Sequence, residues 1–243
     1  MKNVFIYLLA ITFSGCTLAQ ELKFSQKPKL VYDYKHKEAI LFLNDSVVLK
    51  TKQKKEVSIY KASFPGNFSE YLPINVAGRT IFIHEGCGPV LEFRNDSLVR
   101  LDKSYLHRNQ FLGNIFVYQN EIYFLGGYGL FTHKKILTRF DFENQEWDLV
   151  KTNDANIPTF KNCLSRVIEN NLFVFGGFTN GSANHNLYIL NLKTKEWNVY
   201  KSNIFKNFDT IIQKQNKLLE EKNGFYLIDE YKMFYLDIKN NSI

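Results

Sequence analysis

The sequence is poor in the residues that mark several specialised protein classes. Among 243 residues it has 3 Cys, 5 Pro and 13 Gly. So few cysteines exclude a disulfide-rich scaffold, and so few prolines and glycines exclude a collagen-like or low-complexity chain. Because 45% of the residues are hydrophobic and only 23% are charged, wholesale disorder is excluded as well. The chain is therefore expected to fold around an ordinary hydrophobic core.

Clusters of one charge and long apolar runs are also scarce. The formal net charge is +7, but the lysines are scattered apart from Lys50–Lys55 and Lys134-Lys135. A nucleic-acid surface needs a clustered basic stripe with a reading element, so no nucleic-acid partner is predicted. Downstream of residue 20 no apolar stretch approaches the roughly 20 residues that cross a bilayer. No transmembrane helix is therefore predicted in the mature chain.

The first 20 residues resemble a secretory signal. Lys2 is followed by a short apolar run, Val4–Phe13, and by small residues at Ser14-Gly15. A basic start, a short apolar run and a small-residue cleavage zone direct export. We therefore divide the chain into a signal peptide over 1–20 and a mature part over 21–243.

Two processing routes are open for this signal. Phe13-Ser14-Gly15-Cys16 resembles a bacterial lipobox with Phe13 where Leu is usual, and this route acylates Cys16 as a lipid anchor. The alternative is an ordinary signal-peptidase site after Ala19, a junction that resembles those of exported proteins of the Bacteroidetes type. The expected location is the periplasm, or the outer membrane or cell surface as a lipoprotein, with secretion as the alternative.

Aromatic residues, by contrast, are abundant, with 22 Phe and 14 Tyr. Many of them fall in short apolar motifs such as IYFL (122–125), LFVF (172–175) and FYLI (225–228). Phe and Tyr favour strands over helices. The composition therefore indicates a protein rich in β-structure.

Two stretches of the chain repeat each other. Gly126-Gly127 and Trp147 in the first match Gly176-Gly177 and Trp197 in the second, each 50 residues later. A fixed period with such marks indicates a repeat architecture. Within it, paired glycines permit close backbone approaches that a Cβ atom would block.

This order of apolar strand, Gly-Gly, a Leu-Tyr-x-Leu-type strand and Trp resembles the kelch repeat. The resemblance implies an all-β fold, a kelch-type β-propeller built from four-stranded blades, with the clearest repeats at 116–165 and 166–215. Trp147 and Trp197 are then expected in the core between blades.

Weaker copies flank these two repeats. Apolar strands that begin near Ile40, Ile81, Ile122, Leu172 and Phe225 are interpreted as the first strand of each blade, which gives about five blades. Kelch propellers more often have six or seven blades. A propeller that is incomplete or open is therefore an alternative to a closed ring.

Other segments of this scheme allow more than one interpretation. In the second unit, Gly86-Cys87-Gly88 stands where Gly-Gly is expected. Leu30–Tyr34 is a candidate strand to complete the last blade. Ile211–Asn223 is either a short helix or two strands around a turn at Asn223-Gly224. Cys87 and Cys163 form either a disulfide or two buried thiols.

The sequence contains no common catalytic signature. It has no GxSxG, HExxH, CxxC, phosphate-loop or dinucleotide fingerprint, and its five histidines form no close pair. The motif-borne chemistries and paired-ligand metal sites therefore have no support. The spacing of Tyr, His and Cys also does not select the copper set of kelch-type oxidases. No catalytic residue, cofactor or metal is predicted.

Ligand contacts in propellers come from the loops at one mouth, because the strands supply a rigid scaffold. Aromatic and polar residues in those loops suit protein side chains or sugar faces. Two arginines match in LVRLD (98–102) and LTRFD (137–141), and they would form an anion-binding ring if they faced a channel. The candidate ligand residues are Tyr128, Phe131, His133, Phe178, His185, His84, Glu85, Arg100 and Arg139.

The predicted function is a non-catalytic binding module at the cell envelope, which recognises a protein or glycan through its blade loops. The alternative is a kelch-type carbohydrate-active enzyme such as a sialic acid mutarotase, whose channel would use Arg100, Arg139 and Glu85. A third reading is a degenerate paralogue with little activity of its own.

Overall fold

The computed structural model describes residues 28–33, 37–43, 48–52, 56–60, 67–95, 97–103, 109–153, 156–201, 217–221, 224–228 and 233–237. The predicted signal peptide over 1–20, with Cys16, lies outside the described residues. Within these ranges the chain forms β-strands and one short 3-10 helix, η1 (Phe68–Glu70), and no α-helix. None of the helical structure in the described ranges is long and apolar enough to cross a membrane.

The strands pair into five successive main sheets within the described residues. Sheet one contains β1 (Lys29–Asp33), β2 (Glu38–Phe42), β3 (Val48–Lys52) and β4 (Glu56–Tyr60). Sheet two contains β5 (Tyr71–Val76), β6 (Arg79–His84), β7 (Val90–Arg94) and β8 (Ser97–Arg100). Sheet three contains β9 (Asn114–Tyr118), β10 (Glu121–Leu125), β13 (Leu137–Asp141) and β14 (Glu146–Val150). Sheet four contains β16 (Leu164–Ile168), β17 (Asn171–Phe175), β20 (Leu187–Asn191) and β21 (Trp197–Lys201), and sheet five contains β22 (Lys217–Glu221), β23 (Gly224–Ile228) and β24 (Met233–Asp237).

Two short ladders are inserted after the second strands of sheets three and four. The first is the hairpin of β11 (Tyr128–Gly129) and β12 (Thr132–His133). In the second, β18 (Phe178–Thr179) pairs with both β19 (Ser182–Ala183) and β15 (Phe160–Lys161). The two insertions are therefore equivalent hairpins in adjacent sheets.

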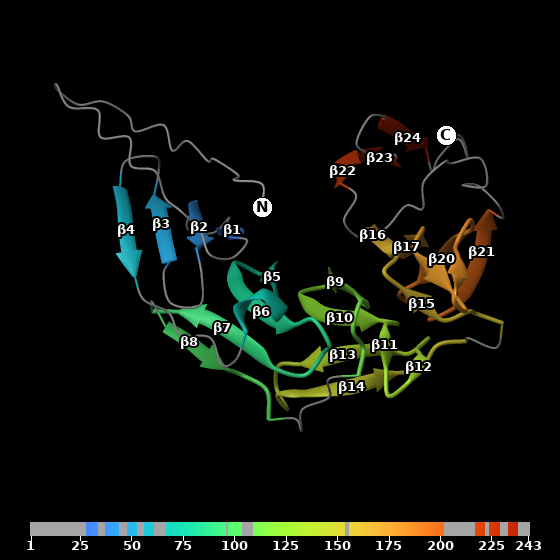
Figure 1. The fold of residues 1–243 in the computed structure, drawn as a ribbon, viewed down its shortest axis with the longest axis horizontal. Coiled ribbons are helices and arrows are strands. Elements are labelled where there is room, and N and C mark those ends of the chain that lie inside the picture. The colour runs from blue at the N-terminus through green and yellow to red at the C-terminus, as the bar shows by residue number, and fades with distance from the viewer. Residues whose placement is uncertain are drawn as a thin grey trace.

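Each main sheet is an antiparallel meander, and the sheets follow one another in chain order along an open arc (Figure 1). In sheets one to four the first strand lies on the inner side of the arc and the fourth on the outer side (Figure 1). The fold is an all-β, kelch-type propeller arrangement of blades, as the sequence predicts.

Three details of the predicted blade scheme are settled by the strand pairing. The strands predicted to come first in each blade, such as those at Ile81 and Ile122, are the second strands, because β5 and β9 precede them. Leu30–Tyr34 does not complete the last blade: β1 pairs with β2 of its own sheet. The ambiguous region before Phe225 forms a strand pair, β22 with β23, rather than a helix over 217–221.

The core lies between neighbouring sheets. Side chains alternate along each strand, so Ile122 and Phe124 pack towards sheet two while Tyr123 and Leu125 pack towards sheet four. Because both faces of β10 are covered over residues 122–125, these four residues form an uninterrupted run of apolar and aromatic side chains after Glu121. Equivalent clusters join sheets one and two and sheets four and five.

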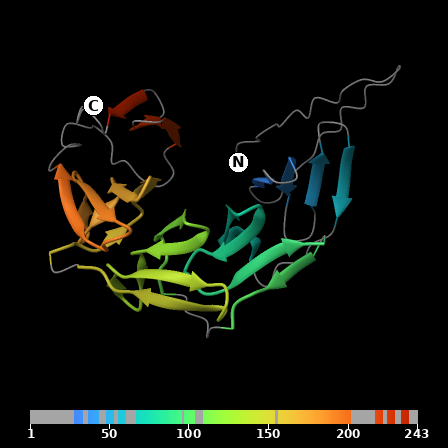
Figure 2. The ribbon, with the colours of Figure 1, turned by 180° about the vertical axis from the view of Figure 1, so that it is seen from behind.

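The first sheet forms one end of the arc. Val31 is buried against sheet two, with 6% of its surface exposed, but its neighbours Leu30 and Tyr32 are 66% and 42% exposed. On β1, the side that points away from sheet two is therefore exposed to solvent at Leu30 and Tyr32. Among the described residues no hydrophobic cluster joins sheets one and five, and Figure 2 shows these sheets at opposite ends of the arc.

Candidate functional site

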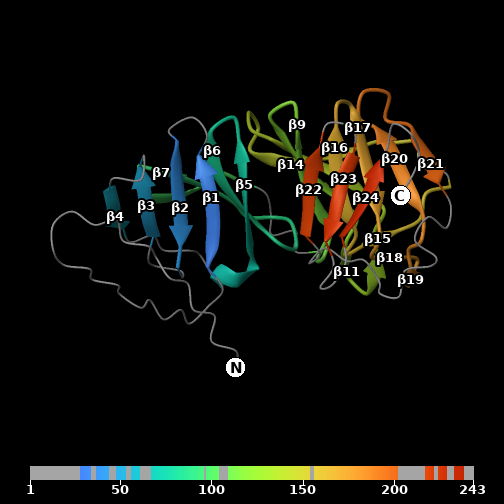
Figure 3. The same ribbon diagram turned by 90° about the horizontal axis from the view of Figure 1, so that it is seen from above.

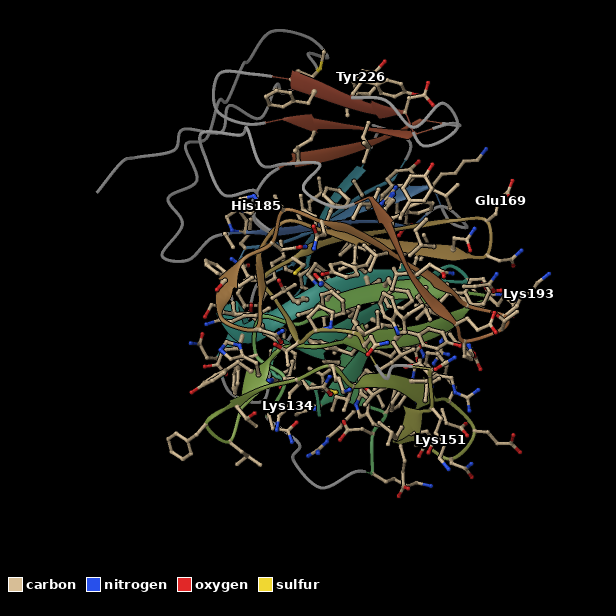
Figure 4. All side chains as sticks on the ribbon, turned by 90° about the vertical axis from the view of Figure 1, so that its right-hand side faces the viewer. Lys134, Lys151, Glu169, His185, Lys193 and Tyr226 are labelled. Atoms are coloured by element: carbon tan, nitrogen blue, oxygen red, sulfur yellow. The ribbon has the colours of Figure 1, made fainter. Side chains whose placement is uncertain are left out.

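The loops that follow the second strands of sheets two to four gather on one side of the molecule, together with the segments that precede the first strands of sheets three and four. We call this side the loop face and define it as residues 84–89, 109–113, 126–136, 160–163 and 176–186. In Figure 3, β11, β18 and β19 lie along the same edge of the sheets. In Figure 4, Lys134 and His185 lie on one side of the molecule, opposite Glu169 and Lys193.

Backbone hydrogen bonds join these loops into one surface. The Asn109 N–H donates to the Gly86 carbonyl at 3.1 Å, which ties the segment before sheet three to the loop of sheet two. Two residues later, Phe111 and Tyr128 exchange backbone hydrogen bonds of 2.9 and 2.8 Å. The loop face is therefore a rigid platform rather than a set of independent loops.

The glycine pairs allow this close approach of segments. Gly127 and Gly177 have φ values of +98° and +61°, in the region that L-residues rarely adopt. A Cβ atom on Gly177 would lie 2.6 Å from the carbonyl carbon of Asn162, and one on Gly127 would collide with the backbone of Gln110. The repeated Gly-Gly thus serves the packing of the loop face.

The two equivalent hairpins have different turn residues. In the hairpin of sheet four the turn is Asn180-Gly181, with φ values of 49° and 84°. In the hairpin of sheet three it is Leu130-Phe131, with φ values of 50° and 61°. Two successive positive φ values form the two-residue hairpin turn that favours Asn-Gly. Phe131, one of the predicted ligand residues, is 97% exposed at this tip.

An aromatic and basic cluster lies at the foot of the β11–β12 hairpin. The half-buried Tyr128 ring lies 5.1 Å from the ring of His133. Lys161 Nζ lies 5.3 Å from the centroid of the Tyr128 ring. Phe111, which pairs with Tyr128 through the backbone, is partly exposed. The structure thus brings together two predicted residues, Tyr128 and His133, with Lys161, which no sequence pattern marked. Phe111, also unmarked, joins them through the backbone, and its ring lies 6.0 Å from that of His84.

His84 and Glu85 belong to the framework of the loop face. The His84 ring is 1% exposed; its Nε2 lies 2.9 Å from a Glu70 carboxylate oxygen, and its Nδ1 accepts a hydrogen bond from the Gly86 N–H at 3.1 Å. Both ring nitrogens are therefore engaged inside the protein. The Glu85 N–H donates to the Glu70 carbonyl at 2.6 Å, so this pair also fixes the loop to the start of sheet two.

Arg100 and Arg139 do not lie at equivalent positions. Arg100 is on β8, the outer strand of sheet two, whereas Arg139 is on β13, the third strand of sheet three. The match between LVRLD and LTRFD was therefore wrong, because the third strand of sheet two is Val90–Arg94. The structure does not bring the two arginines together into a ring.

Each arginine is paired with acids of its own sheet. Arg100 donates two hydrogen bonds to Asp102, at 2.8 and 3.1 Å. Arg139 donates to Glu121 at 3.1 Å and lies 3.5 Å from Asp148. Both arginines are thus held in local ion pairs within their own sheets, an arrangement that gives no support to the carbohydrate-enzyme alternative.

The remaining predicted residues lie on the loop of sheet four. Phe178 is half-buried on β18, where it pairs with Lys161 and Ala183. His185 is half-buried in the segment that follows β19, on the same side of the molecule as Lys134 (Figure 4). Both residues therefore belong to sheet four, the neighbour of sheet three, whose hairpin carries the Tyr128 cluster.

The two cysteines are buried between sheets, and the two tryptophans are partly buried there. Cys87 and Cys163 are free thiols in different core clusters, and burial raises the pKa of each to about 12. Trp147 packs between sheets two and three and donates from Nε1 to the Gly88 carbonyl at 2.8 Å. Trp197 stacks on Phe160 at 5.4 Å in the cluster between sheets three and four.

Comparison with known proteins gives one match. Residues 159–203, which include sheet four and its hairpin, match the family model of the Kelch motif. No curated protein matches the chain. In the part of the chain that the structure describes, no group of three or more His, Cys, Asp or Glu side chains is placed to hold a metal ion. The match and the strand topology together support a kelch-repeat β-propeller.

Proposed function

We propose that this chain is a non-catalytic interaction module that binds a protein partner through the loop face. The observation that carries this proposal is the cluster of Phe111, Tyr128, His133 and Lys161 on a hydrogen-bonded platform. Aromatic side chains held on a rigid scaffold are typical centres of protein interfaces, and a lysine beside them can pair with an acidic group of the partner. The Kelch motif over 159–203 supports an interaction role.

A protein is favoured over a glycan because of the packing of the Tyr128 ring. Sugar recognition uses an open aromatic face, but this ring already has Lys161 and His133 within 5.3 and 5.1 Å. The lysine places a cation beside an aromatic surface, which suits an acidic or polar protein side chain. A glycan array on which the purified chain binds sugars, with loss of binding in Tyr128→Ala, would contradict this preference.

We further propose that the module works at the cell envelope, on the basis of the signal-like sequence over 1–20. The test is the mass of the mature N-terminus in the cells of origin. An acylated N-terminal Cys16 or a free N-terminus at Gln20 supports export, and an intact Met1 contradicts it. Cys16→Ser separates the routes, because it blocks only the lipoprotein route.

The binding proposal is tested by site-specific photo-crosslinking in the full chain. A crosslinking amino acid replaces Thr132 or His185 on the loop face, and the matched control replaces Leu149 on the outer strand β14, which is 63% exposed. We expect crosslinks from both loop-face positions to the same protein, with none from the control. That protein, produced separately, must then bind the purified chain.

Two results would overturn the proposal. One is the same set of crosslinked proteins from Leu149 as from the loop face. The other is a captured protein that does not bind the purified chain at any concentration tested.

A further inference from the structure

The tip of the β11–β12 hairpin combines features that folding does not require. Leu130 and Phe131 both have positive φ values, 50° and 61°, although L-residues with branched or bulky side chains are strained there. Their side chains are 75% and 97% exposed, so the fold gains almost no burial from them. Two large apolar residues thus occupy strained positions in contact with solvent.

The same chain shows how this turn is built when only folding matters. The equivalent hairpin of sheet four has Asn180-Gly181 at its tip, with φ values of 49° and 84°. Asn and Gly are the residues that this turn favours, and no atom lies within 4 Å of a Cβ placed on Gly181. The comparison indicates that Leu130-Phe131 serves a contact outside the fold.

The base of the hairpin is fixed, so the tip does not fold back onto the protein. The Lys134 N–H donates to the Gly127 carbonyl at 2.8 Å, and the Lys134 carbonyl accepts from the Phe160 N–H at 3.0 Å. Gly129 is packed directly against the backbone of Asn109. The apolar tip is therefore presented on a rigid support.

The chain segment that forms the hairpin carries charge of one sign. Lys134 and Lys135 follow β12, Lys161 lies against Tyr128, and the sequence has no acidic residue between Glu121 and Asp141. The corresponding stretch of sheet four, 171–191, contains no charged residue at all. The apolar tip and the lysines that follow it therefore occur together in the β11–β12 hairpin, and both are absent from residues 171–191 of sheet four.

We propose that the β11–β12 hairpin inserts its tip into the interface of an anionic lipid bilayer. Apolar side chains bury in the boundary between headgroups and acyl chains, and lysines next to them attract anionic headgroups. A lipid surface accepts such a small apolar tip when lysines accompany it. This inference goes beyond the proposed protein binding and does not rest on it.

The test uses residues 20–243, the chain that an ordinary signal-peptidase cleavage after Ala19 would leave, which contains every strand described above. Its binding is measured by cosedimentation with vesicles of phosphatidylglycerol and phosphatidylcholine, and with vesicles of phosphatidylcholine alone. We expect binding to the mixed vesicles that is at least about tenfold stronger than to phosphatidylcholine and falls as salt rises. Leu130→Asn/Phe131→Gly, which copies the tip of sheet four, should reduce the binding at least about tenfold.

A matched control and a second readout make the test specific. Leu149→Asn removes an apolar side chain that is 63% exposed on β14 and should leave vesicle binding unchanged. In Phe131→Trp, the tryptophan emission should shift to the blue on mixed vesicles and be quenched by brominated lipid, which reports insertion directly. A folded Leu130→Asn/Phe131→Gly variant that binds as the native chain does would overturn the proposal, as would a native chain that binds neither vesicle. Neither result affects the crosslinking test of protein binding.

Discussion

Replacing the tip Leu130-Phe131 by Asn-Gly should make the protein more stable. Bulky L-residues in the left-handed region cost about 1–2 kcal/mol each, and both tip residues have φ values in that region. Because their side chains are 75% and 97% exposed, almost no buried apolar area is lost. Introducing Gly raises the entropy of the unfolded chain, at a cost of about 0.5–1 kcal/mol. The free energy of unfolding should therefore rise by about 1–2 kcal/mol.

This gain is measurable by urea and thermal unfolding. For a chain of this length the gain corresponds to an increase in Tm of about 3–6 °C. The slope of the unfolding free energy against urea concentration should be unchanged. The reverse variant, Asn180→Leu/Gly181→Phe, should lower stability by more than this amount, because it introduces the strained pair and also removes the hydrogen bonds that Asn180 Oδ1 accepts from Thr159. If Leu130→Asn/Phe131→Gly is no more stable than the native chain, the turn is not strained and the argument from strain fails.

Three further predictions concern the framework. Trp147→Ala should lower the free energy of unfolding, measured in urea melts, by about 3–5 kcal/mol. Trp147 packs between sheets two and three and donates a hydrogen bond to the Gly88 carbonyl. A loss under about 1 kcal/mol would place Trp147 outside that core. Gly177→Ala should destabilise clearly more than Gly181→Ala, since both have positive φ but only Gly177 lies against backbone, that of Asn162, and equal losses would contradict this packing. The two buried thiols, whose pKa burial raises to about 12, should remain un-ionised and resist iodoacetamide at pH 8 until the chain is unfolded; rapid labelling of the native chain would show that they are accessible.

The sequence predicts sheets three and four well because their marks are local. A Gly-Gly pair and a Trp at a period of 50 residues follow directly from the packing of the loop face and of the core between sheets. The order of strands within a blade was harder to predict. The first strands, such as β9 and β16, carry no such mark, and the strands next to the glycines were therefore numbered first although they are second.

The site depends on pairing between distant segments, and this limits prediction from sequence. Phe111 and Lys161 join the Tyr128 cluster because the segments before sheets three and four pass beside the hairpins, which no local pattern reveals. His84 illustrates the opposite error. Its place before Gly86 makes it a candidate ligand residue, but its Nε2 pairs with the Glu70 carboxylate and its Nδ1 accepts from the Gly86 N–H. Residue type and loop position alone did not distinguish these cases.

The most direct test of the central claim is the affinity of loop-face variants for the crosslinked partner. Titration of Lys161→Ala/His133→Ala against the purified partner, beside Leu149→Ala from the outer strand, compares the two surfaces in one assay. The loop-face variant should bind at least about tenfold more weakly with an unchanged melting curve, and the control should bind within about twofold of the native chain. An unchanged affinity in the loop-face variant, with a loss in the control, would place the binding surface on the outer strands and contradict the account.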